Sequence, residues 1–208
     1  MMSFSIEEIQ KFLPQYLSAA TFDQLKQELK DYPDNIDSRM YTTYIEPNIV
    51  YQGDGLRDMP VVKMSADHRT DIQYLPSIIL SNTCDIDLAN TRFFSASIMF
   101  APIISLDKYR KTLLECGVDE KKVDAHIAVI KTQQCTQIFY LPASPAMHES
   151  IVFLDRVCHS NNRDVDRKGL SEKRIFSLSQ YGFYMLLFKL SIHFCRMQEG
   201  VDRNVAIK

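Results

Sequence analysis

The sequence predicts an α+β protein built around a small, strongly bent antiparallel β-barrel that carries added helices. Short runs of β-branched and aromatic residues follow one another from about residue 49 to residue 178, with turn-forming residues between them. These runs do not alternate with single helices, which disfavours a doubly wound parallel sheet. Helical patterns occur instead in three blocks: before the strands, once between them and after them.

Composition places the chain among ordinary globular proteins. It has 208 residues, of which 46% are hydrophobic and 24% charged, and a formal net charge of −2. These values fit one domain, with or without a small appendage, and exclude a disordered, collagen-like or disulfide-scaffold protein. The near-zero charge also disfavours a dedicated nucleic-acid binder, although a local basic patch is compatible with it.

The expected location is the cytoplasm. The five cysteines are odd in number and no two form a C-x-x-C pair, which favours reduced thiols over a disulfide framework or a zinc site. The N-terminus lacks the basic start and long apolar run of a signal peptide. The most apolar stretch, residues 181–195, falls short of the roughly 20 residues of a membrane span, so no membrane contact is expected.

Residues 1–48 are predicted to form a helical N-terminal arm. Ser5 with Glu8, and Thr21 with Gln24, form capping boxes at the starts of two helices. Residues 1–60 contain 5 Lys and Arg against 10 Asp and Glu, a net charge of −5, which leaves +3 for the rest of the chain. The arm is therefore either a solvated acidic segment or a segment that docks on a basic face of the main domain.

Residues 49–208 are predicted to form the barrel domain. Two helices are expected to interrupt the barrel at residues 105–132, the first capped by Ser105 or Asp107 and the second by Asp119. A long C-terminal helix capped by Ser179 is expected at residues 179–198, and the polar residues 160–173 are expected to form a mobile loop. Strands are expected at residues 49–51, 60–64, 77–81, 94–101, 136–141, 150–157 and 174–178.

The sequence contains no motif for a cofactor or a metal ion. It has no G-x-x-x-x-G-K-[ST] and no G-x-G-x-x-G phosphate loop, and its five histidines form neither H-E-x-x-H nor a close pair. We therefore expect no nucleotide cofactor, no other cofactor and no metal site.

The first candidate site is the polar segment at residues 81–87, which directly follows an apolar strand. It contains Asn82, Cys84, Asp85 and Asp87, and functional side chains are common on loops anchored by rigid strands. Asp85 and Asp87 would share a face if the chain were extended there. The alternative is a structural turn in which Asn and Asp side chains accept hydrogen bonds from nearby backbone amides.

The second candidate site is Asp155 with Arg156. On a strand, Asp155 would face the same side as core residues and would need a cationic partner, for which Arg174 and Arg92 are the candidates. A buried structural ion pair is the favoured interpretation. Basic residues also gather at positions 163–174, but acidic residues dilute them and no aromatic residue lies among them, which weakens an RNA-binding interpretation.

Four short motifs occur in a defined order: YQGD at residues 51–54, LPSIILSN at 75–82, FAPIIS at 100–105 and FLDRV at 153–157. In this order they resemble the GD turn, the R-P-x-x-V-x-S strand, the P-I-T-S strand and the apolar-Asp-x-Val strand of the PemK/MazF-type toxins. The closing strand and its helix also match in order. The resemblance covers roughly residues 49–198 without the two-helix insertion, and it implies an SH3-like barrel.

The resemblance also implies the endoribonuclease chemistry of that family, which uses an Arg before the Pro and a Thr in the P-I-T-S segment. The matching positions here are Leu75 and Ile104. Aliphatic side chains do not stabilise the charge that develops during phosphoryl transfer, and losing one such donor typically costs about 100- to 1000-fold in rate. The helical arm and the insertion are also foreign to the small toxins.

Two functional hypotheses follow. The leading one is a non-catalytic, toxin-like barrel that binds a protein partner or a second copy as a regulatory component of a bacterial toxin–antitoxin or phage-defence system. The alternative is an endoribonuclease that cleaves single-stranded RNA with relocated catalytic residues, for which Asp85, Arg92, Ser105 and Arg174 are the candidates. A third hypothesis is a hydrolase that uses Cys84 with a distant histidine.

Overall fold

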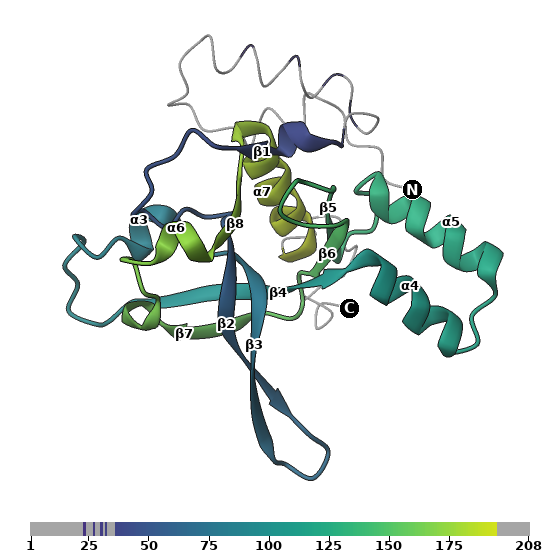
Figure 1. Cartoon of the computed structure of the whole chain (residues 1–208), viewed down its shortest axis with the longest axis horizontal. Coiled ribbons are helices and arrows are strands. Elements are labelled where there is room, and N and C mark those ends of the chain that lie inside the picture. Colours follow the sequence, from purple (N-terminus) through teal and green to yellow (C-terminus); the bar gives the residue numbers. More distant parts are fainter. Residues whose placement is uncertain (1–22, 24–26, 28–29, 31, 33–35, 195–208) are drawn as a thin grey trace, which may run out of the picture.

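The computed structural model describes residues 36–194 together with residues 23, 27, 30 and 32. The capping boxes predicted for the arm and the predicted helix end at residues 195–198 lie outside the described residues. The elements of Figure 1 are, in chain order, η1 (Ser38–Met40), β1 (Tyr41–Thr42), β2 (Gly55–Met64), β3 (Thr70–Ile79), α3 (Thr83–Ile86), β4 (Ser97–Ser105), α4 (Leu106–Glu115), α5 (Glu120–Lys131), β5 (Ile138–Leu141), β6 (Ser150–Phe153), β7 (Cys158–Asn161), η2 (Asn162–Asp164), α6 (Leu170–Lys173), β8 (Arg174–Leu178) and α7 (Gln180–Phe194).

The protein is α+β, as predicted, and its eight strands form one antiparallel sheet. The strand order is β1-β8-β2-β3-β4-β6-β5, with β7 also paired to β4. In the described part of the chain no pairing joins β1 to β5, so the sheet is open. β4 is the central strand: Phe100 pairs with Ile79 of β3 on one edge and with Cys158 of β7 on the other.

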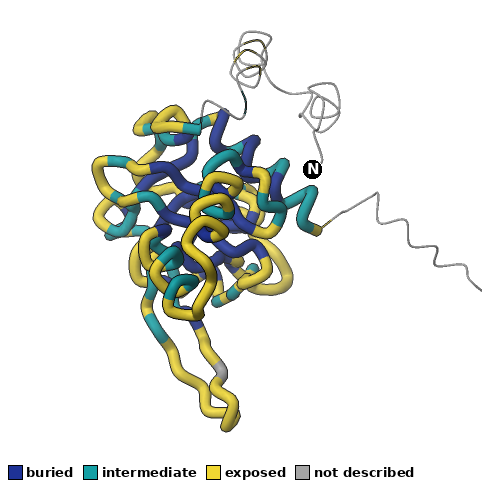
Figure 2. Tube along the Cα trace, turned by 90° about the vertical axis from the view of Figure 1, so that its right-hand side faces the viewer, coloured by how far each residue is buried: buried dark blue, intermediate teal, exposed yellow. Residues whose placement is uncertain are grey.

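β2 and β3 extend beyond the body of the molecule as a two-stranded arm (Figures 1 and 2). β8 pairs with β2 only at Gly55 and Leu56, and β4 pairs with β3 only at residues 77–79. Residues 57–76, called the hairpin arm below, therefore pair only with each other within the sheet.

Helices cover both faces of the β5–β6 ribbon, which explains why every residue of these two strands is buried. Phe139 and Val152 point toward α7, in a cluster that also contains Ala101 and Leu186. Alternate residues of the same strands point the other way and pack against α4 and α5; they include Ile138, Tyr140 and Ile151. A third cluster lies between β2, β3 and β4 and the short helices α3 and α6.

The predicted capping of the inserted helices is confirmed. Ser105 caps α4 by accepting a hydrogen bond from the Lys108 N–H group, and Asp119 caps α5 by accepting one from the Lys122 N–H group, at 3.4 Å and 3.3 Å. Ser179 likewise accepts a hydrogen bond from the Gly182 N–H group at the start of α7.

Four expectations about strands and loops are wrong. Residues 49–51 form no strand and lead as a loop into the turn before β2. Phe94 is exposed in a loop, and β4 begins at Ser97. The strand expected at residues 150–157 ends at Phe153, and after a turn β7 continues along the same edge of β4. The segment expected to be a loop at residues 160–173 contains η2 and α6, because buried polar contacts described below hold it in place.

No helix in the described part of the chain combines the length and the apolar character that crossing a membrane requires.

Candidate functional site

A fully buried carboxylate lies in the turn that leads into β2. Asp54 has no solvent-exposed surface. Gly53 precedes it at a φ of +91°, a conformation that favours glycine, and its N–H group donates to the Ile79 carbonyl at 2.8 Å. A side chain at Gly55 would collide with the Phe176 ring, since a Cβ there would lie 2.3 Å from it. The two glycines thus hold the turn closely against β3 and β8.

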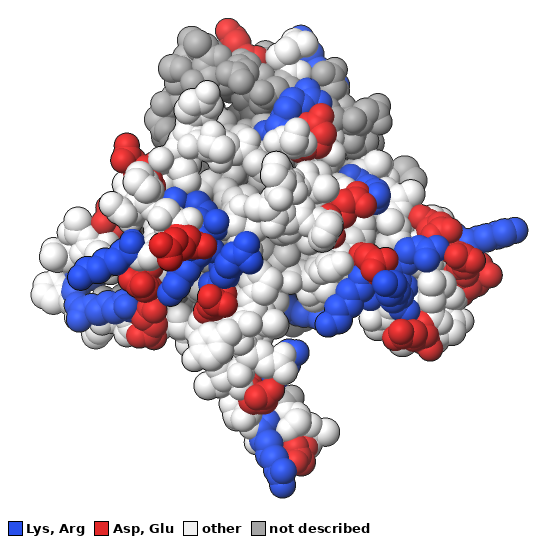
Figure 3. Space-filling model, viewed as in Figure 1, with Lys and Arg blue, Asp and Glu red and all other residues white. Residues whose placement is uncertain are grey.

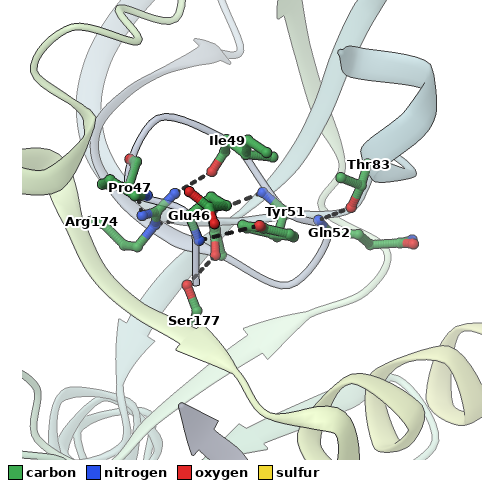
Figure 4. Close-up of polar contacts among 9 residues, drawn as sticks. Glu46, Pro47, Ile49, Tyr51, Gln52, Thr83, Arg174 and Ser177 are labelled. Carbon is green, nitrogen blue, oxygen red and sulfur yellow. Dashed lines mark hydrogen bonds and ion pairs between the residues drawn. The ribbon is translucent and has the colours of Figure 1, made fainter. Parts of the chain in front are cut away.

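Three residues labelled in Figure 4, Tyr51, Arg174 and Ser177, donate hydrogen bonds to the Asp54 carboxylate. It accepts hydrogen bonds from the Tyr51 N–H group at 2.9 Å, from the Ser177 hydroxyl and from Arg174 Nε at 3.1 Å. Arg174 also donates to the carbonyls of Pro47 and Ile49. One buried ion pair therefore ties the segment 47–54 to β8.

The electrostatics of this pair favour a structural role. Burial raises the pKa of Asp54, while the hydrogen bonds from Ser177, Tyr51 and Arg174 oppose that rise. The Arg174 side chain is only 8% exposed. A carboxylate and a guanidinium without free access to solvent are not positioned to meet a substrate, so Arg174, a predicted catalytic candidate, acts here as a counter-ion.

The polar segment after β3 is a capped helical turn rather than an extended strand end. Asn82 caps α3 by accepting from the Cys84 N–H group at 2.9 Å, and Asp87 accepts from the Ala89 N–H group at 2.9 Å. The Thr83 hydroxyl accepts from the Gln52 N–H group at 3.0 Å, which joins α3 to the Asp54 turn (Figure 4). The hydrogen bonds expected of a structural turn, from backbone amides to Asn and Asp side chains, are therefore present at Asn82 and Asp87.

The other candidates from this region lie at the surface. Asp85 forms an exposed ion pair with Arg92, so the structure brings these two predicted residues together. Cys84 is exposed, and its described hydrogen bonds are made by its backbone: its N–H group donates to Asn82 and its carbonyl accepts from Asn90. Ser105 is occupied as the cap of α4.

The predicted buried ion pair at Asp155 is wrong. Asp155 lies in the turn after β6 and is exposed, because the strand ends two residues earlier. Arg174 is paired with Asp54 and Arg92 with Asp85 instead. Arg156 is also exposed, and its guanidinium lies 4.1 Å from the centroid of the Phe153 ring.

Arg167 anchors the basic segment to α3. Its guanidinium donates to the carbonyls of Asn162 and Val165, each at 2.7 Å, and to the Ile86 carbonyl at 3.3 Å. Asn162 is buried and donates to the same Ile86 carbonyl at 2.8 Å. Burial lowers the pKa of Arg167, and the nearby Asp87 opposes that shift. Sequence reasoning missed this contact, because nothing in the spacing indicates which basic residue turns inward.

Taken together, the four catalytic candidates are divided among separate contacts in the described part of the chain. Arg174 is held by Asp54, Arg92 and Asp85 hold each other, and Ser105 caps a helix. The sequence did not single out Asp54 and Ser177 as site residues. The GD turn at residues 53–54, which contains Asp54, was the sequence feature that could have indicated them. Among the described residues, no group of three His, Cys, Asp or Glu side chains is arranged to hold a metal ion.

Neither the protein-family models nor the curated proteins that were searched contain a match to this chain.

Proposed function

We propose that the protein is a non-catalytic, toxin-like barrel that acts by binding protein, as a regulatory component of a bacterial toxin–antitoxin or phage-defence system. The observation that carries this proposal is the engagement of the candidate catalytic side chains in internal structural bonds. Arg174 neutralises the buried Asp54, and Ser105 caps α4. Asp85 and Arg92 neutralise each other at the surface.

The residues at the positions that match the catalytic Arg and Thr of the toxins that this chain resembles support the same proposal. Leu75 is partly buried against the cluster between β2, β3 and β4, and Ile104 is partly buried against the cluster under α4 and α5. Both side chains pack with apolar neighbours, so neither position supplies a donor to a developing phosphorane.

The SH3-like barrel is part of this proposal. The β2–β3 register shifts between Leu56 and Met59, and the β2–β8 register shifts between Gly55 and Leu56. Such irregularities bend a strand and increase its twist. Gly55 pairs with β3 and with β8, so the bend lies where a small barrel would curve. The sheet would then be a barrel left open between β1 and β5.

Expression of the chain in a bacterial culture tests this function. We expect induced wild-type protein to leave the growth rate unchanged, because the four candidate catalytic side chains are engaged in ion pairs or in a helix cap. The matched variants are Arg92→Ala and Ser105→Ala, which should behave like the wild type. Growth arrest by the wild type that either variant abolishes would contradict the proposal and favour the endoribonuclease alternative.

A further inference from the structure

One edge of β3 is open over residues 70–76 in the described part of the chain. β3 pairs with β4 along this edge only at residues 77–79, and residues 70–76 pair with β2 on the other edge. Figures 1 and 2 show these residues in the hairpin arm, which projects from the body of the molecule. Figure 3 shows the arm exposed from the same side as Figure 1. This stretch of strand edge is called the open edge below.

The backbone bonds of the neighbouring residues show which groups face the open edge. The Ile79 N–H group donates to the Asp54 carbonyl, on the side of β2, whereas the Leu80 N–H group donates to a carbonyl of β4, each at 2.8 Å. Successive residues of a strand direct their N–H and C=O groups to alternate edges. The even-numbered residues Ile72 and Tyr74 therefore direct theirs to the open edge, where no described strand pairs with them.

The outer edge of β2, by contrast, is closed. Pro60 has no N–H group, and the register shift between Leu56 and Met59 bends the strand. β7 lies beside β2 farther along, with the Cys158 thiol close enough to the Val62 N–H group to interact with it. Prolines, bulges and covering segments are the means by which proteins keep an edge strand from pairing with another chain.

The outer edge of β5 is closed by side chains. The Gln133 side chain accepts a hydrogen bond from the Tyr140 N–H group at 3.1 Å and donates one to the Tyr140 carbonyl at 2.7 Å, as a neighbouring strand would. The Pro142 carbonyl, just after β5, accepts from the Tyr41 hydroxyl at 2.7 Å. β1, at the other end of the sheet, has only two residues. Among the described strands these edges are protected, whereas the open edge of β3 is not.

We infer that the open edge binds an extended segment of the protein partner, which joins the sheet as an antiparallel strand beside β3. A row of N–H and C=O groups at strand spacing is complementary to another polypeptide backbone, and strand addition to an exposed edge is a recurring mode of peptide recognition. All strand pairs described in this sheet are antiparallel, which favours the same orientation. This inference rests on the proposed protein-binding function and names the form of the partner.

The side chains beside the open edge specify the sequence pattern of that segment. Val62 pairs with Ile72, so both lie on the same face of the hairpin arm as Tyr74. All three side chains are more than half exposed. A residue of the added strand that exchanges backbone bonds with Ile72 or Tyr74 also points to this face. We therefore expect an apolar residue at every second position of the partner segment.

Fluorescence anisotropy with a labelled synthetic peptide tests the inference. The peptide alternates valine and threonine and has a lysine at each end for solubility. We expect it to bind the purified full chain. Methylating the N–H groups of its valines should abolish binding, because these groups face β3, whereas methylating those of its threonines should not, because they face solvent. Binding that does not distinguish the two methylated peptides would overturn the inference.

Ile72→Pro and Ile72→Ala are the matched variants, and circular dichroism checks that each keeps the wild-type fold. Proline removes the N–H group that faces the open edge but leaves the β2–β3 bonds in place, so it should raise the peptide dissociation constant by about 10-fold or more. Alanine keeps that group and should raise the constant by no more than about 5-fold. Amide exchange needs no variant: the peptide should slow exchange of the Ile72 and Tyr74 N–H groups of the wild type by about 10-fold or more.

The absence of peptide binding at millimolar concentration would overturn the inference, as would unchanged amide exchange at Ile72 and Tyr74. Self-association of the wild type that Ile72→Pro abolishes would also overturn it, because the open edge would then serve a second copy of this chain. Failure of the peptide to bind a protein that neither arrests growth nor cleaves RNA would contradict the added strand alone and leave the proposed function standing.

Discussion

At the scale of single residues, Asp54 and Arg174 form a buried ion pair that joins the turn before β2 to β8. The carboxylate is fully buried, and the guanidinium also holds two backbone carbonyls of the segment 47–51. Removing one member of a buried pair leaves the other charge without compensation, which costs far more than the loss of an exposed pair.

Replacing Arg174 by Met should therefore destabilise the protein strongly. We expect a loss of about 3–5 kcal/mol in the free energy of unfolding, measured by urea denaturation. The matched control is Arg92→Met, which removes an exposed pair with Asp85 and should cost no more than about 1 kcal/mol. Equal costs for the two variants would show that the Asp54 pair does not stabilise the fold.

Lys189 is a second buried charge, and it predicts a pH dependence. Its ammonium group donates to the carbonyls of Gln133, at 2.9 Å, and Cys135, just beyond the end of α5. Burial lowers the pKa of Lys189 from 10.5 to about 8, and the neighbouring Cys135 partly opposes that shift. Between these two values the unfolded chain binds more protons than the folded chain, so the contribution of Lys189 to stability rises with pH.

The stability of the wild type relative to Lys189→Met should accordingly increase as the pH rises from about 8 to 10. The expected slope is at most about 1.4 kcal/mol per pH unit. Urea denaturation of both proteins at pH 7, 8 and 9 measures this slope. The difference between their free energies of unfolding at each pH removes the contribution of the other titrating groups. Parallel pH profiles for the two proteins would show that the buried amine titrates normally.

At the scale of elements, the sequence predicted correctly the helix caps and the strand that depend on interactions between residues close together in the chain. The caps at Ser105 and Asp119 and the strand at residues 174–178 match the structure, because side-chain capping and continuous apolar runs are local signals. The first half of β3 was missed, because residues 70–76 mix polar and apolar side chains and gain their order only from pairing with β2.

The candidate site was predictable only in part, because its chemistry depends on contacts between distant residues. The Asn82 cap and the Asp85–Arg92 pair join residues at most seven positions apart. The bond from Arg174 to Asp54 spans 120 positions, and no local pattern indicates that the guanidinium turns inward. Asp155 was misplaced for a related reason, since the end of β6 at Phe153 is set by its pairing with β4 and β5.

The packing of α7 provides a prediction at this scale. Gly182 lies in its first turn, where a Cβ would meet the Met40 carbonyl oxygen at 2.3 Å. Alanine normally stabilises a helix relative to glycine by roughly 0.5–1 kcal/mol. Here Gly182→Ala should instead destabilise the protein by about 1–3 kcal/mol, because the backbone of η1 must shift. Thermal unfolding shows whether the variant is less or more stable than the wild type. A higher melting temperature for the variant would contradict the close approach of α7 to η1.

At the scale of the whole molecule, helices and loops cover three apolar clusters, while several large apolar side chains stay exposed, among them Phe93, Phe94 and Tyr74. The buried side chains of Asp54, Asn162 and Lys189 are engaged in internal hydrogen bonds, and the exposed apolar side chains remain available for contacts. This division favours a protein that acts through its surface over one that acts through a catalytic cleft.

Incubation with single-stranded RNA tests this central claim most directly. We expect the full chain, in molar excess over a labelled RNA of mixed sequence, to leave the RNA intact over hours. The positions that would match the catalytic Arg and Thr of the toxins it resembles are Leu75 and Ile104, and the candidate replacements are engaged in other contacts. RNA cleavage that follows the protein through purification and is lost in Arg92→Ala or Ser105→Ala would contradict the account and identify the protein as an endoribonuclease.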